Sequence, residues 1–191
     1  MEDKPELYFE RDIDWYDWLL QNHDRSKGVY LIFYKLETKI PSMRWEEAVR
    51  TALCFGWIDS TVKSLGSGKR KQYFCKRNPK GAWSALNKRH VAELMEAGLM
   101  HESGLKLIEI AKENGAWTYM DDVEKGIIPE DLQTEFDLNP VAFENYQNFS
   151  RGYRKSYLSW LKQAKREATR QKRIEKIIEC CNNNIKSPFE F

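Results

Sequence analysis

The stretch ALCFGWIDS, residues 52–60, joins a predicted helix to a predicted strand and constrains the fold of this chain most. Gly56 suits the left-handed conformation that ends a helix, and the following WIDSTVKSL is rich in β-forming residues. Functional residues are often carried by loops on a rigid scaffold, so this junction is the first candidate site. The helix before it shows apolar residues at the spacing of one helix face: Trp45, Ala48, Val49, Ala52 and Leu53.

The order of the predicted elements places the chain in the α+β class. A helix at residues 12–22 and a strand at residues 28–36 precede the junction, and a β-hairpin turns at residues 66–68. Few strand signals follow residue 77. We therefore expect a small, mainly antiparallel sheet packed with helices, followed by an all-helical C-terminal subdomain. The segment 120–129 marks the boundary between a domain at residues 1–125 and a subdomain at residues 126–191.

Composition excludes several classes of protein. No segment of the 191 residues is apolar over the roughly 20 positions needed to cross a bilayer. The N-terminal segment is acidic and lacks the hydrophobic region of a signal peptide. We expect a cytoplasmic protein with no transmembrane segment and no membrane association. The 4 cysteines form no CxxC pair, and no histidine has zinc-ligand spacing from them. The sequence predicts neither a metal site nor a cofactor.

Trp57 and Asp59 are the first pair that the junction offers for a binding site. Alternate side chains of a strand share a face, so we expect Trp57 and Asp59 on one face with Lys63 further along it. Pairing within the hairpin makes an ion pair of Asp59 with Lys76 or Arg77 feasible. Two interpretations stay open: a carboxylate that binds a ligand beside an indole, and a structural aspartate paired with a neighbouring base or backbone amide.

Several motifs together resemble a family. They are ALCFGWIDS, WSALN at 83–87, AELMEAGLM at 92–100, AKENGAW at 111–117 and YRKSYLSWLKQAKREATRQKRIEKII at 153–178. Over Trp15 to Ile178 the chain resembles the YdeI/OmpD-associated family, also called bacteriocin-protection proteins. The resemblance implies a cytoplasmic bacterial protein linked to bacteriocin tolerance or envelope stress, with no established catalytic activity.

With this resemblance, the interpretation that we favour is a non-enzymatic binding or interaction module. Its partner is a small molecule or a protein of unknown identity, and no catalytic residue is assigned. The candidate ligand-binding residues lie on the junction, the hairpin and the following helix: Trp57, Asp59, Lys63, Arg77, Trp83 and Asn87.

Clusters of basic residues support a second interpretation, a nucleic-acid-binding protein. The net charge is only +2, but residues 151–191 hold 11 basic and 4 acidic side chains. Cations interleaved with aromatic residues, in the hairpin at 63–80 and the helices at 151–176, suit phosphate neutralisation and base stacking. The alternative is a solvated basic face. The candidate contacts to nucleic acid or another anion are Lys69, Arg70, Lys71, Arg154, Lys165, Arg166, Arg170 and Arg173.

A third interpretation is an uncharacterised enzyme centred on Asp59, with Cys54 or His90 nearby. Cys54 lies near the end of a helix, and the negative end of the helix dipole raises the pKa of a thiol. A nucleophilic cysteine needs a lowered pKa instead. No Ser/His/Asp or Cys/His arrangement follows from the spacing, so we rank this interpretation last.

Overall fold

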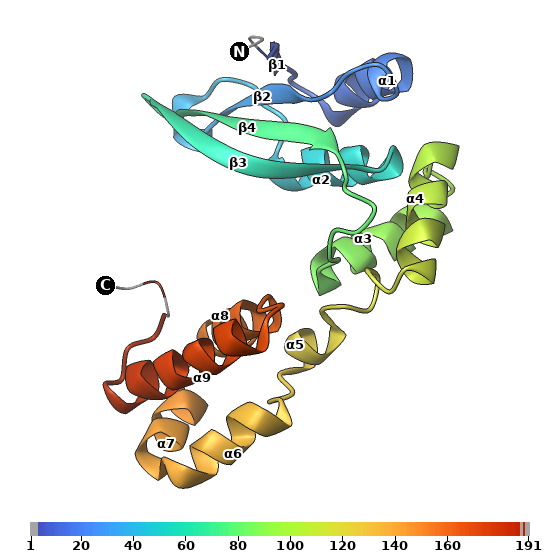
Figure 1. The fold of residues 1–191 in the computed structure, drawn as a ribbon. Helices are drawn as coiled ribbons and strands as arrows, with labels where there is room; N and C mark the ends of the chain where they lie inside the picture. The colour runs from blue at the N-terminus through green and yellow to red at the C-terminus, as the bar shows by residue number, and fades with distance from the viewer. Residues whose placement is uncertain (1–3, 188, 190–191) are drawn as a thin grey trace. The chain divides into compact units, whose positions relative to one another are not determined.

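The computed structural model describes residues 4–187 and 189 and divides into two compact units, Met1–Thr118 and Tyr119–Phe191 (Figure 1). Each unit encloses its own hydrophobic core. The boundary expected between residues 125 and 126 lies inside the second unit, directly after its first helix.

The N-terminal unit combines a mixed sheet with helices. The strands lie in the order β1-β2-β4-β3; β1 runs parallel to β2, and the other two pairs are antiparallel. The α+β class is confirmed. Between residues 4 and 118 the elements are β1 (Glu6–Tyr8), α1 (Asp12–Asn22), β2 (Val29–Tyr34), the 3₁₀-helix η1 (Leu36–Thr38), α2 (Trp45–Cys54), β3 (Trp57–Gly66), β4 (Lys69–Lys76), α3 (Ala85–Glu96) and α4 (Glu102–Glu113).

Helix α2 and the turn after it set up the junction that the sequence emphasises. At its start, the backbone N–H of Arg44 donates to the Glu47 carboxylate over 2.7 Å, which satisfies a donor at the helix entrance. At its end, Gly56 has a φ of 74°, a conformation that favours glycine. The Gly56 carbonyl then accepts a hydrogen bond of 2.9 Å from the backbone N–H of Arg77. This bond fixes the start of β3 beside the end of β4.

One face of the sheet forms the core of the N-terminal unit. Strand side chains alternate, so Val29, Leu31 and Phe33 of β2 point to this face, and each is at most 3% exposed. They pack with α1, α2 and β4, and Figure 1 shows α2 lying along β3. The intervening β2 residues, Tyr30 and Tyr34 among them, point to the opposite face.

Every regular element in the described part of the C-terminal unit is a helix, as expected. A core of fully buried side chains, with Leu132, Phe136, Tyr157, Leu161 and Ile177 at 0% exposure, holds it together. Its helices are α5 (Asp121–Lys125), α6 (Glu130–Leu138), α7 (Pro140–Asn148), α8 (Arg151–Lys162) and α9 (Glu167–Asn182).

Candidate functional site

Trp57 is a core residue and offers no surface to a ligand. Its side chain is 0% exposed, and its indole N–H donates to the carbonyl of His23 over 3.1 Å. The rings of Trp15 and Trp18 lie edge-on to it, with centroids 6.2 and 6.1 Å away. Trp57 and Asp59 share the face of β3 that turns to the core, and this burial argues against the expected ligand-binding indole at Trp57.

Asp59 is held by two donors from within the fold. Its carboxylate accepts a 2.9 Å hydrogen bond from the indole N–H of Trp45 and another from the side-chain amide of Gln72, which is 3% exposed. Asp59 lies opposite Phe74 in the ladder, and among the described residues neither Lys76 nor Arg77 is within ion-pair distance of it. The proposed ion pairs are therefore absent there, and the contacts favour the structural interpretation of Asp59.

Arg77 and Trp83 are brought together, but inside the protein. The guanidinium carbon lies 3.8 Å from the Trp83 ring centroid, and Nη2 donates to the carbonyl of Ala82. Arg77 is 8% exposed and Trp83 is 1% exposed. Burial lowers the pKa of Arg77 to about 10, and the charge of Asp59 opposes that shift. The pair suits a structural cation–π contact and leaves no room for stacking by a ligand.

Lys63 does not share a face with Asp59, because a β-bulge intervenes. Asp59 pairs with Phe74, but Lys63 pairs with Lys71, so β3 has one residue more than β4 between these rungs. One extra residue reverses the alternation beyond it. Lys63 therefore lies on the face away from the core, which corrects the expectation from simple strand alternation.

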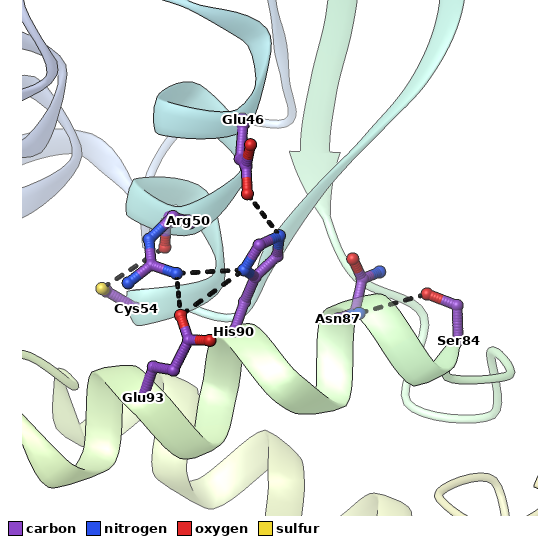
Figure 2. Close-up of polar contacts among 7 residues, drawn as sticks. All are labelled: Glu46, Arg50, Cys54, Ser84, Asn87, His90 and Glu93. Atoms are coloured by element: carbon purple, nitrogen blue, oxygen red, sulfur yellow. Dashed lines mark hydrogen bonds and ion pairs between the residues drawn. The ribbon is translucent and has the colours of Figure 1, made fainter.

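A polar network that the sequence analysis did not assemble joins α2 to α3 (Figure 2). An Arg50 guanidinium nitrogen lies 3.0 Å from Nδ1 of His90 and also bonds the Glu93 carboxylate. A guanidinium only donates, so Nδ1 accepts and Nε2 carries the proton. That Nε2 is 3.6 Å from a Glu46 oxygen and has no hydrogen-bond partner among the described residues. The sequence contains one indication of this network. Glu46 and Arg50 have the spacing i, i+4 and His90 and Glu93 the spacing i, i+3, so each pair shares one face of its helix.

The network keeps His90 neutral and gives it a structural role. His90 is 2% exposed, and burial, then the nearby Arg50 charge, lowers its pKa. Asn87, another candidate, lies one turn earlier on α3, where its backbone N–H donates to the capping hydroxyl of Ser84 over 3.2 Å (Figure 2). The α2–α3 network therefore explains His90 and does not bring Asn87 to a ligand.

The residues of the enzyme interpretation are not assembled. Asp59 binds Trp45, the first residue of α2, whereas Cys54 is the last residue of that helix, about 14 Å away along the helix axis. Burial raises the pKa of Cys54 to about 11, so its thiol stays protonated at neutral pH. A hollow of about 340 Å³ beside Arg50 and Cys54 has mainly apolar walls, including Ile13, Leu94 and Leu99. Nothing in this geometry activates a nucleophile.

The face of the sheet opposite the core gathers tyrosines and lysines. One row of paired residues crosses all four strands. In this row, Tyr8 of β1 pairs with Ile32 of β2, Ile32 pairs with Lys71 of β4, and Lys71 pairs with Lys63 of β3. Neighbouring rows pair Tyr30 with Tyr73 and Tyr34 with Lys69. We call this surface the tyrosine face; it comprises Lys4, Tyr8, Tyr30, Tyr34, Lys63, Lys69, Lys71 and Tyr73.

Ammonium groups lie over the rings of the tyrosine face. The distances from Nζ to the ring centroid are 3.8 Å for Lys4 over Tyr73, 4.6 Å for Lys71 over Tyr30 and 5.8 Å for Lys69 over Tyr34. The rings also contact one another, with Tyr30 and Tyr73 centroids 5.2 Å apart. Lys69 and Lys71 share the tyrosine face, whereas Arg70 alternates to the other face, 5.4 Å from the Phe33 ring. The result is a surface that is both aromatic and cationic.

The basic residues of the C-terminal helices differ in their contacts and in their exposure. Arg170 forms a two-pronged ion pair with Asp131, and Arg173 donates to the Trp160 carbonyl and stacks on that ring at 4.9 Å. Both are occupied by structural contacts. Lys165 and Arg166 are exposed, and Arg154 lines a hollow. The five candidates therefore do not form one anion-binding surface.

The described part of the chain contains neither a metal-binding cluster nor a membrane-spanning helix. Over residues 4–187 and 189, no three His, Cys, Asp or Glu side chains are grouped as a metal ion would require. In those same residues, no helix has both the length and the apolar character needed to span a membrane.

Comparisons with known proteins divide the chain in the same way as its two units. A family model described as "Domain of unknown function (DUF8412)" matches residues 7–107. A second model, OmdA, described as "Bacteriocin-protection, YdeI or OmpD-Associated", matches residues 125–184. That match confirms the resemblance for the C-terminal part and is narrower than residues 15–178. No curated protein and no solved structure matches the chain.

Proposed function

The chain belongs to the family of the domain of unknown function DUF8412 and carries a C-terminal match to the OmdA model. From this premise we propose that the chain is a non-enzymatic binding protein. Its N-terminal unit binds single-stranded nucleic acid on the tyrosine face. This merges the binding module expected from the family with the nucleic-acid interpretation. It moves the site from Trp57 and Asp59 to the opposite face of the same sheet.

The observation that carries the proposal is the alternation of rings and ammonium groups on one sheet face. Unpaired bases stack on aromatic rings, and lysines neutralise the phosphates between them. Tyr8 is 39% exposed, and the side chains of Tyr30, Tyr34 and Tyr73 are half-buried. Their rings are therefore both supported by the sheet and accessible from solvent. A duplex hides its base faces, so this surface favours a single strand.

Charge supports the same partner. The lysines of the tyrosine face share a nearby carboxylate, Glu6, whose pKa is lowered by its hydrogen bond with Lys71 and by the charges of Lys69 and Lys63. Among the described residues, the four lysines of the tyrosine face and this carboxylate give a net charge of about +3 for phosphates. With about three phosphates contacted, the logarithm of the binding constant should fall with the logarithm of salt concentration at a slope of about −2.

The occupied state of the alternative residues supports binding over catalysis. Asp59 already accepts from Trp45 and Gln72, and the Cys54 thiol has a raised pKa. The description of the C-terminal family links that family to bacteriocin protection. We propose the same role for this chain, and survival of a deletion strain exposed to bacteriocin tests it. We also propose a cytoplasmic location, which cell fractionation tests.

The direct test is fluorescence anisotropy with a labelled single-stranded oligonucleotide at low salt. We expect binding that weakens with salt at the slope given above. Lys63→Gln/Lys69→Gln should weaken binding about tenfold and flatten the slope, because each lost cation contacts phosphate. Tyr34→Ala should weaken binding by about 1–3 kcal/mol, the contribution of one stacked base.

A matched control separates the tyrosine face from general basicity. Lys80→Gln/Lys106→Gln removes two exposed lysines elsewhere on the same unit and should leave affinity unchanged. Binding that is absent at low salt, or equal losses for both double variants, would contradict the proposal.

A further inference from the structure

A hollow of about 230 Å³ lies among α5, α7 and α8 of the C-terminal unit. Its wall carries four cationic side chains, those of Lys125, Arg151, Arg154 and Lys155, and one carboxylate, that of Glu124. The local charge is therefore strongly positive. Val123 and Ile128 add an apolar portion to the wall.

The carboxylate of Glu124 does not neutralise this charge. Glu124 forms a 2.7 Å ion pair with Lys155, and its main-chain carbonyl accepts from the guanidinium of Arg151 over 3.0 Å. Arg154 makes no ion pair with any residue between 4 and 187, or with residue 189. The two guanidinium groups thus remain without a carboxylate at the hollow.

The hollow also contains a phenol from a largely buried residue. Tyr146 lines the hollow and is 2% exposed, yet its hydroxyl has no hydrogen-bond partner within the described residues. Burial raises the pKa of Tyr146 to about 12, although the Arg154 charge acts in the opposite direction. The hydroxyl is therefore protonated at neutral pH and can donate a hydrogen bond to a molecule in the hollow.

The start of α8 adds to the same imbalance. Its first turn contains no acidic residue, and Ser150 before it forms no side-chain cap. Instead, three of the first five positions of the helix are basic: Arg151, Arg154 and Lys155. The N-terminus of a helix is the positive end of its dipole, so cations there are unfavourable and a bound anion is favourable.

We propose that this hollow binds the phosphate group of a small phosphorylated molecule. A phosphate monoester carries nearly two negative charges and three acceptor oxygens. Guanidinium groups bind such oxygens in pairs, and the phenol hydroxyl donates one further hydrogen bond. The apolar wall contacts the organic part of the ligand. The site lies in a different unit from the tyrosine face and does not depend on it.

The test uses the full chain and inorganic phosphate as the probe. Isothermal titration at constant ionic strength should show saturable binding. We expect Arg154→Gln to weaken it at least tenfold and Tyr146→Phe severalfold, because each removes a donor to the phosphate. Tyr146→Phe keeps the buried ring, so it tests the site even if Arg154→Gln disturbs folding.

Controls decide where the phosphate binds and what chemistry is recognised. Lys165→Gln, at an exposed lysine of the same unit, should bind as the unmodified protein does, and so should Lys63→Gln/Lys69→Gln. The proposal is overturned by non-saturable titration, by equal affinity in Tyr146→Phe, by loss of binding in the tyrosine-face variant, or by acetate binding as tightly as phosphate.

Discussion

At the scale of single residues, the carboxylate of Asp59 is held by hydrogen bonds from other side chains of the same unit. Removing its carboxylate leaves the buried amide of Gln72 and the indole N–H of Trp45 without their acceptor. A buried donor that loses its partner costs about 1–3 kcal/mol. We expect Asp59→Ala to lower the free energy of unfolding by that amount in urea denaturation.

Asp17→Ala is the matched control for this prediction. Asp17 is an exposed aspartate on α1 of the same unit, and its loss should change the free energy of unfolding by at most about 0.5 kcal/mol. Asp59→Ala that unfolds like the unmodified protein but no longer binds nucleic acid would show that Asp59 is a ligand residue.

Sequence reasoning succeeded for Asp59 as far as strand alternation reaches. It placed Trp57 and Asp59 on one face, and the structure agrees. It did not tell which face was buried, because aromatic residues occupy both faces of β4: Phe74 is in the core and Tyr73 is outside. Burial depends on where α1 and α2 pack, and that is not encoded in the strand itself.

At the scale of elements, α2 and α3 are joined by a neutral, buried histidine. The folded-state pKa of His90 is lowered from its ordinary value of 6.5, so the unfolded chain binds a proton more readily. The stabilising effect of keeping His90 neutral is complete above about pH 6.5 and declines as the pH falls below it. We therefore expect the free energy of unfolding to decrease from pH 7.5 to 5.5.

The variant His90→Gln isolates this effect. Denaturation midpoints at pH 7.5, 6.5 and 5.5 should change less in the variant than in the unmodified protein, because its buried group does not titrate. Glu46, Glu93, Arg50 and Arg89 face or flank the ring. The hydrogen bond from Arg50 lowers the pKa of Glu93, so Glu93 keeps its charge in this window. Identical pH dependence in both proteins would disprove the assignment.

Periodicity predicted the helices better than the pairing of strands. The helix at 12–22 has the bounds that the structure gives α1, and the apolar stripe from Trp45 to Leu53 lies within α2. The bulge in β3 was missed, because it depends on how two strands meet and not on the residues of one. Likewise the Arg50–His90 contact joins residues 40 positions apart, beyond any local pattern.

At the scale of the whole molecule, the two units carry separate cores. The family matches at residues 7–107 and 125–184 fall one in each unit. The sequence predicted both the α+β part and the helical part, since each has its own periodicity. The hollow beside Tyr146 was not predicted, because three separate helices supply its wall.

Separate cores predict separate folding. We expect a fragment of residues 119–191 to show helical circular dichroism and a cooperative thermal transition, and a fragment of residues 1–118 to unfold cooperatively as well. Each buries a contiguous apolar cluster of its own, which is the requirement for an independent domain. A gradual, non-cooperative transition in either fragment would show that its core is incomplete.

The bulge in β3 also affects the open edge of the sheet. β3 is ten residues long and lies at the edge of the sheet. A long, regular edge strand is a template on which another polypeptide can add a strand and begin a fibril. The extra residue interrupts that regularity, and Lys63 just beyond it places a charge beside the open edge. The same local irregularity that supplies a cation to one face therefore protects the sheet from self-association along its side.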